Sequence, residues 1–518
     1  MSSVTVHVAL LSGEQTTIVL PWLATIEELR QMAQEEVSKS LGKLVSSSGA
    51  VLLPSDTLQQ AGVQANDVIT AVVQDVVIAA TKHAFAAILS SGTVVAWGAP
   101  HAGGDCSAVQ HQLQNVQQIQ SSAFAFAALL ADGSVVTWGR QDSGGDSSMV
   151  QAQLHSVCQI QANLRAFAAI KADGSVVTWG DPWSGGDCGA VRDQLQDVQQ
   201  IQATNGAFAA IRTGRQVVTW GQRAFGGDSS KVRNSLQDIL QVYNAGWGFA
   251  AIKAGGRIVF WGLTGDDLGE QSTGLDSIDF FQAAEYYWAA ATKDGHLALG
   301  FESVSGHGSM LVPDGAGAAG MMRLDKAIAV VQPDGTVRLW GHSIPKWLSS
   351  GLRNVVRLQA ASAWGPYAAI RSDGSVVTWD QDFKQAASKA VQAQLIDVRN
   401  IQATENAFAA LRGDGSVVTW GQADWGGDSD AVQGQLKDVV SLQATCGAFA
   451  AVRSDGSVVT WGFPSSGGDS RACEWGRPKK PSKQIPRAKP LAKTARANAK
   501  SVLKRPSKTS RVYIGFRV

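Results

Sequence analysis

The stretch Ala166-Phe-Ala-Ala-Ile-Lys-Ala-Asp-Gly-Ser-Val-Val-Thr-Trp-Gly180 decides the fold, because variants of it recur along most of the chain. Self-similarity at a fixed period is typical of repeat architectures. The Trp position of this stretch is filled at Trp97, Trp138, Trp179, Trp220, Trp261, Trp340, Trp379, Trp420 and Trp461. The first four steps are 41 residues long, and Leu299 stands midway in the one long gap. We therefore count ten units between about residues 75 and 470.

Each unit follows one local pattern. The Asp173-Gly174 pair predicts a tight turn, because Gly accepts a positive φ without cost. Ser175-Val-Val-Thr-Trp179 is rich in β-branched residues and predicts a strand. After a Gly-Gly-Asp such as Gly144-Gly145-Asp146, the spacing of Val150 and Leu154 predicts a short helical turn, capped by the preceding Asp or Ser. Each unit is thus expected to hold about three strands and a helical turn.

A single unit of this kind cannot bury both of its faces, whereas units stacked around an axis can. The predicted fold class is therefore mainly β, with a β-propeller over residues 75–470. We expect the Ala-Phe-Ala-Ala strand to lie at the crowded axis, where small residues fit. We expect the repeated Trp to be a wedge packed between neighbouring blades.

The repeat resembles that of the regulator of chromosome condensation family in its Ile-x-Ala, Ala-Phe-Ala-Ala-Ile and Asp-Gly-Ser-Val-Val-Thr-Trp-Gly segments. Its 41-residue spacing is similar to the compact form in β-lactamase inhibitor protein II. The family's usual His before the second strand is mostly missing, and only His83 stands near that place. The resemblance implies rings of about seven blades, while the repeat count is ten, so a ring of seven to ten blades is left open.

Composition bounds the compartment. The 518 residues include 44 Lys or Arg and 43 Asp or Glu, and 45% are hydrophobic, which is enough for a sizeable core. Apolar runs fall far short of the roughly 20 residues of a membrane helix, and no signal peptide is visible. Five scattered Cys do not indicate a disulfide framework. We expect an intracellular protein, cytoplasmic or nuclear.

Residues 1–74 predict a separate domain. Val4–Leu10 and Gln15–Leu20 alternate as strands joined by a turn at Ser12-Gly13. Thr25 is placed to cap a helix, and two strand-like runs, 43–45 and 68–73, follow. The helix would carry on one face Ile26, Leu29, Met32 and Ala33.

This ββαββ order is similar to that of ubiquitin-like domains. The chain continues as Gln74-Asp75 instead of ending in Gly-Gly, so the resemblance implies a module that is not conjugated to targets. It also implies an apolar patch for a ubiquitin-binding partner, at positions that could equally be ordinary fold residues. These positions are Leu11, Val45, Thr70 and Val72.

The C-terminal segment 471–518 predicts a disordered basic tail. From residue 477 on it holds 14 Lys or Arg and no Asp or Glu, while residues 1–476 hold 30 basic and 43 acidic residues. Its basic clusters resemble nuclear-import signals or nucleic-acid arms, which bind phosphate without sequence preference. The alternative is a solvated tail that contacts the acidic body. The candidate nucleic-acid-binding residues are Lys479, Lys480, Lys483, Lys504, Arg505 and Lys508.

No catalytic constellation stands out from the repeat. Gly-x-Ser-x-Gly elbows, phosphate loops and zincin helices are absent from the sequence. His101, Cys106 and His111 lie close in sequence but lack a fourth ligand and the usual short spacings of a zinc site. The single Asp of each Gly-Gly-Asp is too little for calcium. We expect no enzyme activity, cofactor or metal.

The leading hypothesis is a non-enzymatic scaffold or adaptor that binds other proteins through a propeller face and is linked to the ubiquitin pathway by its first domain. Aromatic residues in non-consensus loops are the expected anchors, namely Trp183, Phe225 and Trp425. Trp247, Trp288 and Trp364 are interpreted as packing or face residues. The alternative is a chromatin-associated or guanine-nucleotide-exchange-factor-like nuclear protein that uses the tail.

Overall fold

A computed structural model gives the architecture. It describes residues 3–10, 12–37, 41–47, 49–50, 52, 56–73, 76–262, 269–273, 275, 277–283, 287–292, 296–303, 306–312, 320–323, 327–341, 352–361, 366–380 and 387–471. Residues Met1–Trp475 form one compact unit, and Gly476–Val518, the second, lie outside the described residues. None of the helices in the described part has the length and apolar character needed to cross a lipid bilayer.

The N-terminal domain is one four-stranded sheet covered by a helix. Its elements are β1 (Ser3–Leu10), β2 (Gln15–Pro21), α1 (Ile26–Val37), β3 (Leu41–Val45) and β4 (Val68–Val73). The strand order is β2-β1-β4-β3, with β1 and β4 parallel and the other neighbours antiparallel. The predicted ββαββ order is therefore confirmed, while assignment to the ubiquitin-like class stays a prediction.

Helix α1 begins at the predicted cap. The Glu28 amide donates to Thr25 Oγ1 at 3.2 Å, and the Thr25 amide donates to Glu28 Oε2 at 2.7 Å. This reciprocal pair satisfies two amides that the first helical turn leaves unpaired. Ile26, Leu29 and Ala33 are buried as predicted. Met32 is exposed, because it lies on the solvent side of the helix rather than on the predicted face.

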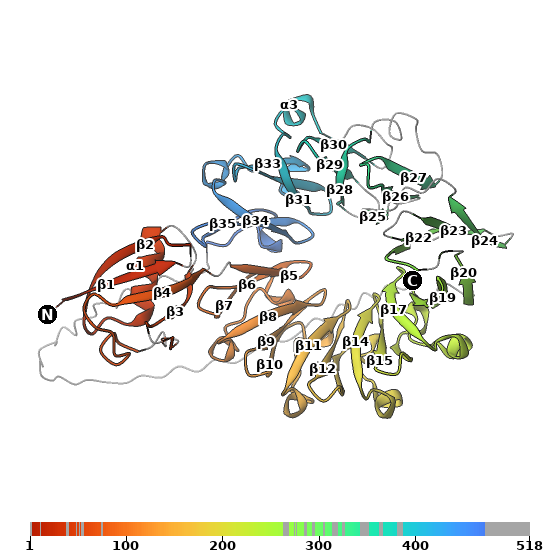
Figure 1. Cartoon of the computed structure of the whole chain (residues 1–518), viewed down its shortest axis with the longest axis horizontal. Helices are drawn as coiled ribbons and strands as arrows, with labels where there is room; N and C mark the ends of the chain where they lie inside the picture. Colours follow the sequence, from red (N-terminus) through yellow and green to blue (C-terminus); the bar gives the residue numbers. More distant parts are fainter. Residues whose placement is uncertain are drawn as a thin grey trace, which may run out of the picture. The chain divides into compact units, whose positions relative to one another are not determined.

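The repeat region forms antiparallel sheets of three or four strands (Figure 1). Sheets 1 to 3 are β5 (Val77–Ala80), β6 (Ala84–Ile88), β7 (Val94–Gly98); β8 (Val116–Ser121), β9 (Ala125–Leu130), β10 (Val135–Gly139); and β11 (Val157–Ala162), β12 (Ala166–Lys171), β13 (Val176–Gly180). Sheets 4 and 5 are β14 (Val198–Ala203), β15 (Ala207–Arg212), β16 (Val217–Gly221); and β17 (Ile239–Asn244), β18 (Phe249–Lys253), β19 (Arg257–Trp261), β20 (Gly269–Ser272).

The second half continues the same arrangement. Sheets 6 to 8 are β21 (Phe280–Ala283), β22 (Tyr287–Ala291), β23 (Leu297–Ser303), β24 (Gly306–Val312); β25 (Gly320–Arg323), β26 (Ala327–Val331), β27 (Val337–Gly341); and β28 (Val355–Ala360), β29 (Tyr367–Arg371), β30 (Val376–Trp379). Sheets 9 and 10, which follow the short helix α3 (Lys389–Gln392), are β31 (Val398–Ala403), β32 (Ala407–Arg412), β33 (Val417–Gly421); and β34 (Val439–Ala444), β35 (Ala448–Arg453), β36 (Val458–Gly462).

The expectation that Ala-Phe-Ala-Ala lies at the axis is wrong. Strand β12, which carries this sequence, lies in the middle of its sheet, pairs with β11 and β13, and is buried almost throughout. First strands of successive sheets contact each other, as β8 does with β5 and β11. The small and aromatic residues are needed because the middle strand is covered on both edges and both faces. The axis is lined by first strands, whose Gln side chains remain partly accessible.

The predicted helical turn is present but short. Gln151–Gln153 and Gly189–Gln194 are 3-10 turns without a side-chain cap. The Gly-Gly-Asp carboxylate instead makes a local turn, since Asp146 Oδ1 accepts from the Ser148 amide at 2.9 Å. Capping by Ser is seen at α3, where Ser388 Oγ accepts from the Val391 amide at 3.3 Å. A carboxylate engaged two residues ahead in a turn is not available to cap the later helical turn.

The repeated Trp is a wedge between sheets, as predicted. Trp220 stacks on Phe208 of its own sheet, with ring centroids 5.3 Å apart. Its Nε1 donates to the carbonyl oxygen of Gly185, in the loop that follows sheet 3, at 3.0 Å. Gly185 has φ +90°, and a Cβ there would lie 2.8 Å from Phe208. The residue must therefore be glycine for both conformational and steric reasons.

The same wedge joins the last sheet to the first. Trp97 Nε1 donates to the carbonyl oxygen of Gly467 at 3.1 Å. The Cys446 amide donates to the carbonyl oxygen of Lys82 at 3.0 Å. Ala448 and Ala450 of β35 share an apolar cluster with Phe85 and Trp97. First and last sheets are thus packed as neighbouring sheets are elsewhere, which gives the repeat region a propeller-like fold.

Candidate protein-interaction face

Two sets of loops lie on one face of the repeat region, which we call the loop face. The first set comprises the turns between the first and second strands of each sheet. The second set comprises the 3-10 loops that follow each Trp-Gly, at Pro100–Ala102, Gln141–Ser143, Pro182–Ser184, Arg223–Phe225, Ala423–Trp425 and Pro464–Ser466. Backbone hydrogen bonds join the sets: the Asp181 amide donates to Arg165 O at 3.0 Å, and the Gln422 amide to Asn406 O at 3.0 Å.

Side-chain hydrogen bonds make these loops rigid. Thr204 Oγ1 donates to the carbonyl oxygen of Phe225 at 2.8 Å, and Thr404 Oγ1 to that of Trp425 at 3.0 Å. In the loop of sheet 3, Asp181 Oδ1 accepts from the Trp183 amide at 3.3 Å. Each loop then ends at a glycine with φ near +90°. Loops fixed in this way present their remaining side chains with little conformational freedom to lose on binding.

The three predicted anchor residues all lie on the loop face, at two different positions. Trp183 is in the middle of its 3-10 loop and is 80% exposed. Phe225 and Trp425 each occupy the next position and are half-buried against apolar clusters that their own sheet forms with the following one. Trp183 is therefore a free contact residue. Phe225 and Trp425 combine an outward edge with a packing role.

Each half-buried ring pairs with a ring of the neighbouring sheet. Phe225 stacks on Trp247 with centroids 5.4 Å apart and planes 10° from parallel. Trp425 lies 6.3 Å from Phe463 at an angle of 45°. Offset and tilted geometries of this kind are favourable for aromatic pairs. The loop face thus carries aromatic pairs that bridge successive sheets.

Two residues of this face, Phe124 and Phe463, were missed from the sequence, and Trp247 was interpreted only generally. Phe124 stacks on His83 at 6.1 Å, and the Arg140 guanidinium carbon lies 5.3 Å from the Phe124 centroid. The signal was available: aligned on the repeat, Phe124 and Trp247 fill the position two residues before the repeated Phe, which holds His, Arg, Gly or Asn in the other regular units. A large aromatic at a position that the fold leaves free is a contact candidate.

The axial end of the loop face is hollow and polar. A cavity of about 430 Å³ is lined by the ends of the first strands and the turns after them, including Lys82, Asn163, Asn205 and Cys446. His83 Nδ1 lies 3.2 Å from Cys446 Sγ. Burial, together with the nearby charges of His101 and Lys82, lowers the pKa of His83, and burial raises the pKa of the Cys446 thiol. Both groups are therefore neutral near pH 7, which favours a structural pair over a reactive thiolate.

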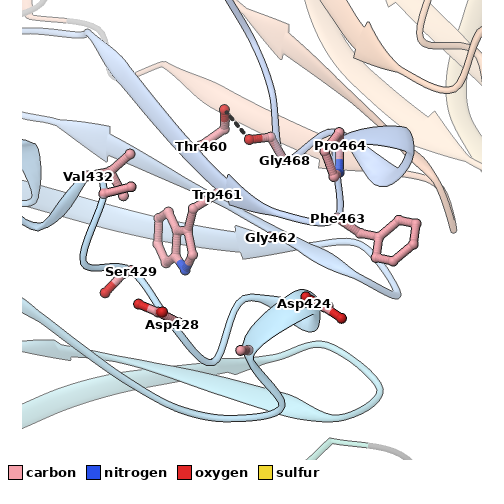
Figure 2. Close-up of a pocket in the computed structure, with 12 residues that line it drawn as sticks. Asp424, Asp428, Ser429, Val432, Thr460, Trp461, Gly462, Phe463, Pro464 and Gly468 are labelled. Atoms are coloured by element: carbon pink, nitrogen blue, oxygen red, sulfur yellow. Dashed lines mark hydrogen bonds between the residues drawn. The ribbon is translucent and has the colours of Figure 1, made fainter.

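A second cavity of about 430 Å³ lies at the rim, between the loops of sheets 9 and 10 (Figure 2). Trp461 forms its floor, with Val432 and Thr460 beside it. Asp424 and Asp428 lie on one side and Phe463 and Pro464 on the other. We call this cavity the rim groove.

The predicted patch of the N-terminal domain is partly described. Val45 of β3 is directly opposite Thr70 of β4 and both are half-buried, while Val72 is 38% exposed on the same face of β4. Val68, also exposed, extends this face. Leu11 lies outside the described residues.

The remaining predicted sites lie outside the described chain or have no counterpart in it. Lys479, Lys480, Lys483, Lys504, Arg505 and Lys508 belong to the segment after residue 471 that the structure does not describe. Within the described residues, no group of three His, Cys, Asp or Glu side chains is placed to hold a metal ion. Of the residues considered for metal, Cys106 is buried and donates to Gln110 Oε1 at 3.1 Å.

Comparisons with known proteins find similar solved structures at low sequence identity. No protein-family model matches the chain, and no curated protein matches its sequence. The computationally designed protein Ika8 is similar over 75% of this chain and 96% of its own, at 13% identity and a TM-score of 0.30. Prp20p from Saccharomyces cerevisiae, a protein with binding properties to Gsp1p and histones, matches over 68% and 82%, at 12% identity and a TM-score of 0.31.

Another match covers only a small share of the chain. A de novo design based on ubiquitin covers 14% of this chain and 89% of its own, at 20% identity and a TM-score of 0.13. At such identities and TM-scores, none of these likenesses carries an argument about family or activity.

Proposed function

We propose that the chain is a non-enzymatic interaction scaffold, a closed ring of ten blades whose loop face binds another protein. The observation that carries the proposal is the gathering of aromatic side chains from separate sheets on one face. These residues are Phe124, Trp183, Phe225, Trp247, Trp425 and Phe463.

Exposed aromatic side chains have a free-energy cost in water. A ring such as that of Trp183 leaves a large apolar area in water, and stacked pairs such as Phe225 and Trp247 are already ordered. Binding such side chains removes apolar area from water with little loss of rotamer entropy, which is typical of contact hot spots. The last sheet packs on the first, which favours a closed ring that would hold the loops rigidly.

The direct test is affinity purification from native, nuclease-treated lysate with mass spectrometry. A Trp183→Ala, Trp247→Ala double variant is compared with wild type and with Met149→Ala. Met149 is 93% exposed but is outside the loop face, so it is a matched apolar control. We expect proteins captured by wild type and by the control to be lost from the double variant at an unchanged melting temperature. Equal capture by all three chains would show that the loop face is not the binding surface.

The link to the ubiquitin pathway is a separate part of the proposal. The exposed face of β4 with Val45 and Val72 supports it, because an apolar strand face is a surface that a partner helix or sheet can cover. A Val45→Asp, Val72→Asp variant should lose binding to ubiquitin-binding domains while Trp183 variants retain it. Undiminished binding would remove this link and leave the scaffold proposal standing.

The basic tail favours a second candidate function, association with chromatin or nucleic acid. Its 14 Lys or Arg without acidic residues are the supporting observation. Deletion of 477–518 should abolish salt-sensitive retention on chromatin if the tail carries the function. If retention persists after the deletion, nucleic-acid engagement by the tail is excluded as its cause.

A further inference from the structure

The rim groove has two aspartates, Asp424 and Asp428, whose counterparts at some equivalent places of the repeat are paired with an arginine, but which have no such partner among the described residues. Asp424 and Asp428 are exposed at its edge, and Asp428 Oδ1 accepts only a local hydrogen bond from the Asp430 amide, at 2.9 Å, among those the structure describes. None of these three aspartates forms an ion pair within the described part of the chain. Two carboxylates that line the cavity, those of Asp424 and Asp428, are therefore exposed without an ion-pair partner among the described residues, and Asp430 is exposed nearby in sequence.

At two equivalent places the negative charge is paired with an arginine. Asp142 fills the position of Asp424 in the loop after sheet 2, and Arg140 Nε lies 2.6 Å from its Oδ1. Asp469 fills the position of Asp428 after sheet 10, and Arg471 lies 2.6 Å from its Oδ2. The Arg471 guanidinium lowers the pKa of Asp469 to about 2. The rim groove keeps the same carboxylates and lacks the arginines.

The opposite wall of the groove is aromatic. Phe463 is 44% exposed and is joined by the half-buried ring of Trp425. The position of Phe463 holds Ala99, Arg140, Asp181 or Gln222 in sheets 1 to 4. An exposed aromatic ring facing carboxylates across a cavity is the arrangement that recognises a cationic side chain, through the ring face and through charge-assisted hydrogen bonds.

We propose that the rim groove binds a lysine or arginine side chain from a basic segment of the protein partner. This inference rests on the proposed function and specifies the chemistry of that partner at one place on the loop face. The cationic head lies between Asp424 and Asp428, and its aliphatic stem lies along Phe463 and Pro464 at the groove wall. Long basic side chains bury such stems while the charge is solvated or paired.

The test uses the full chain as bait for phage-displayed random dodecapeptides. We expect the selected peptides to be enriched in Lys or Arg, and the dissociation constant of a selected peptide to rise with salt. Selection of neutral or acidic peptides, or of none, overturns the proposal.

Variants then place the binding. Phe463→Leu should weaken a selected basic peptide roughly two- to fivefold, as expected for loss of an exposed cation–π contact. Asp424→Asn combined with Asp428→Asn should weaken it about tenfold, because two unpaired charges are removed. The side-chain oxygen introduced by Asp428→Asn can still accept from the Asp430 amide, so the turn is preserved. Asp142→Asn, at the arginine-paired counterpart, is the control and should leave the affinity unchanged.

The outcomes separate this inference from the proposed function. If the peptide loses affinity only in Trp183→Ala, the loop face binds but the rim groove does not. If no loop-face variant changes the affinity, both proposals fail for that peptide class. Melting temperatures of all variants, measured in parallel, exclude misfolding as the cause of a loss.

Discussion

Sheets 4 and 9 carry the same strand sequence, Val-Val-Thr-Trp-Gly, yet their Trp residues are not equally satisfied. Trp220 and Trp420 are both nearly buried and stack on Phe208 and Phe408 at 5.3 and 5.0 Å. Trp220 Nε1 donates to the carbonyl oxygen of Gly185, whereas Trp420 Nε1 has no hydrogen-bond partner among the described residues. The difference therefore does not come from the strand sequence, which is the same in both sheets.

The preceding loops differ at three linked glycine positions. Gly180, Gly185 and Gly186 precede Trp220, whereas the chain has Asp380, Gln385 and Ala386 before Trp420. A Cβ at Gly180 would come within 2.5 Å of the Arg165 carbonyl oxygen, and one at Gly186 within 2.4 Å of the Gly180 carbonyl oxygen. The path of the loop before Trp220 therefore requires glycine at both of these positions. The hydrogen bond of the buried Trp therefore depends on the loop of the preceding unit, which supplies the acceptor, as well as on the Trp itself.

The largest effect is expected from introducing a side chain into the complete loop. Gly185→Ala places a Cβ at φ +90° and 2.8 Å from Phe208, so we expect a loss of about 2–4 kcal/mol in the free energy of unfolding. Chemical denaturation followed by Trp fluorescence measures it. Gly214→Ala is the matched control, since its Cβ would meet nothing within 4 Å. Equal destabilisation by both changes would contradict the steric account.

A second experiment compares the two Trp residues directly. Trp220→Phe and Trp420→Phe remove the same volume, but only the first leaves a buried carbonyl oxygen without its donor. We expect Trp220→Phe to be more destabilising by about 1–2 kcal/mol. Denaturation midpoints of the two variants, measured side by side, give the difference. No difference, or the opposite sign, would show that the unpaired Nε1 of Trp420 is inconsequential.

A smaller change, an increase in the free energy of unfolding, is expected at a turn whose sequence differs from the repeat. Arg215 fills the position of Gly174 and has φ 58°, a conformation that costs a non-glycine residue. Arg215→Gly should stabilise the chain by about 0.5–1 kcal/mol, after allowing for the greater entropy of glycine in the unfolded state. Thermal melting of the variant measures the gain. A lower melting temperature would indicate that the Arg215 side chain contributes more than its backbone strain costs.

The smallest expected effect is on how the stability of the chain depends on pH. Hydrogen bonds from the Ser175 side chain and amide lower the pKa of Asp173. A lowered folded-state pKa stabilises above the unfolded value of about 4, and the stabilisation is lost as the pH falls through the folded pKa. Ser175→Ala should therefore shift the denaturation midpoint at pH 7 more than at pH 2. Gln216→Ala, in the turn that has Gly214 instead of Asp, should show no such pH dependence; a pH-independent Ser175→Ala effect would refute the assignment.

The local elements of the repeat were readable from the sequence because each depends on nearby residues. The turn at Asp173-Gly174, the strand ending at Trp179 and the helix cap at Thr25 were all predicted. The place of the Ala-Phe-Ala-Ala strand was not, because small residues suit a strand at a narrow axis and a strand covered on every side equally well. The anchors Trp183, Phe225 and Trp425 stood out as non-consensus loop residues, whereas Phe124 and Phe463 emerged only when neighbouring loops were placed together.

A mainly β repeat protein with a ββαββ domain before it could be predicted without the structure, since turn chemistry and strand propensity act over a few residues and the repeat period is visible in the sequence. Tertiary structure alone decided which strand faces the axis, which rings pair across sheets, and that Asp424 and Asp428 face Phe463 across the rim groove. These features depend on contacts between successive units, whose equivalent residues are 41 positions apart in the sequence. Strands of identical sequence can therefore have different contacts, because the neighbouring loops that pack against them differ.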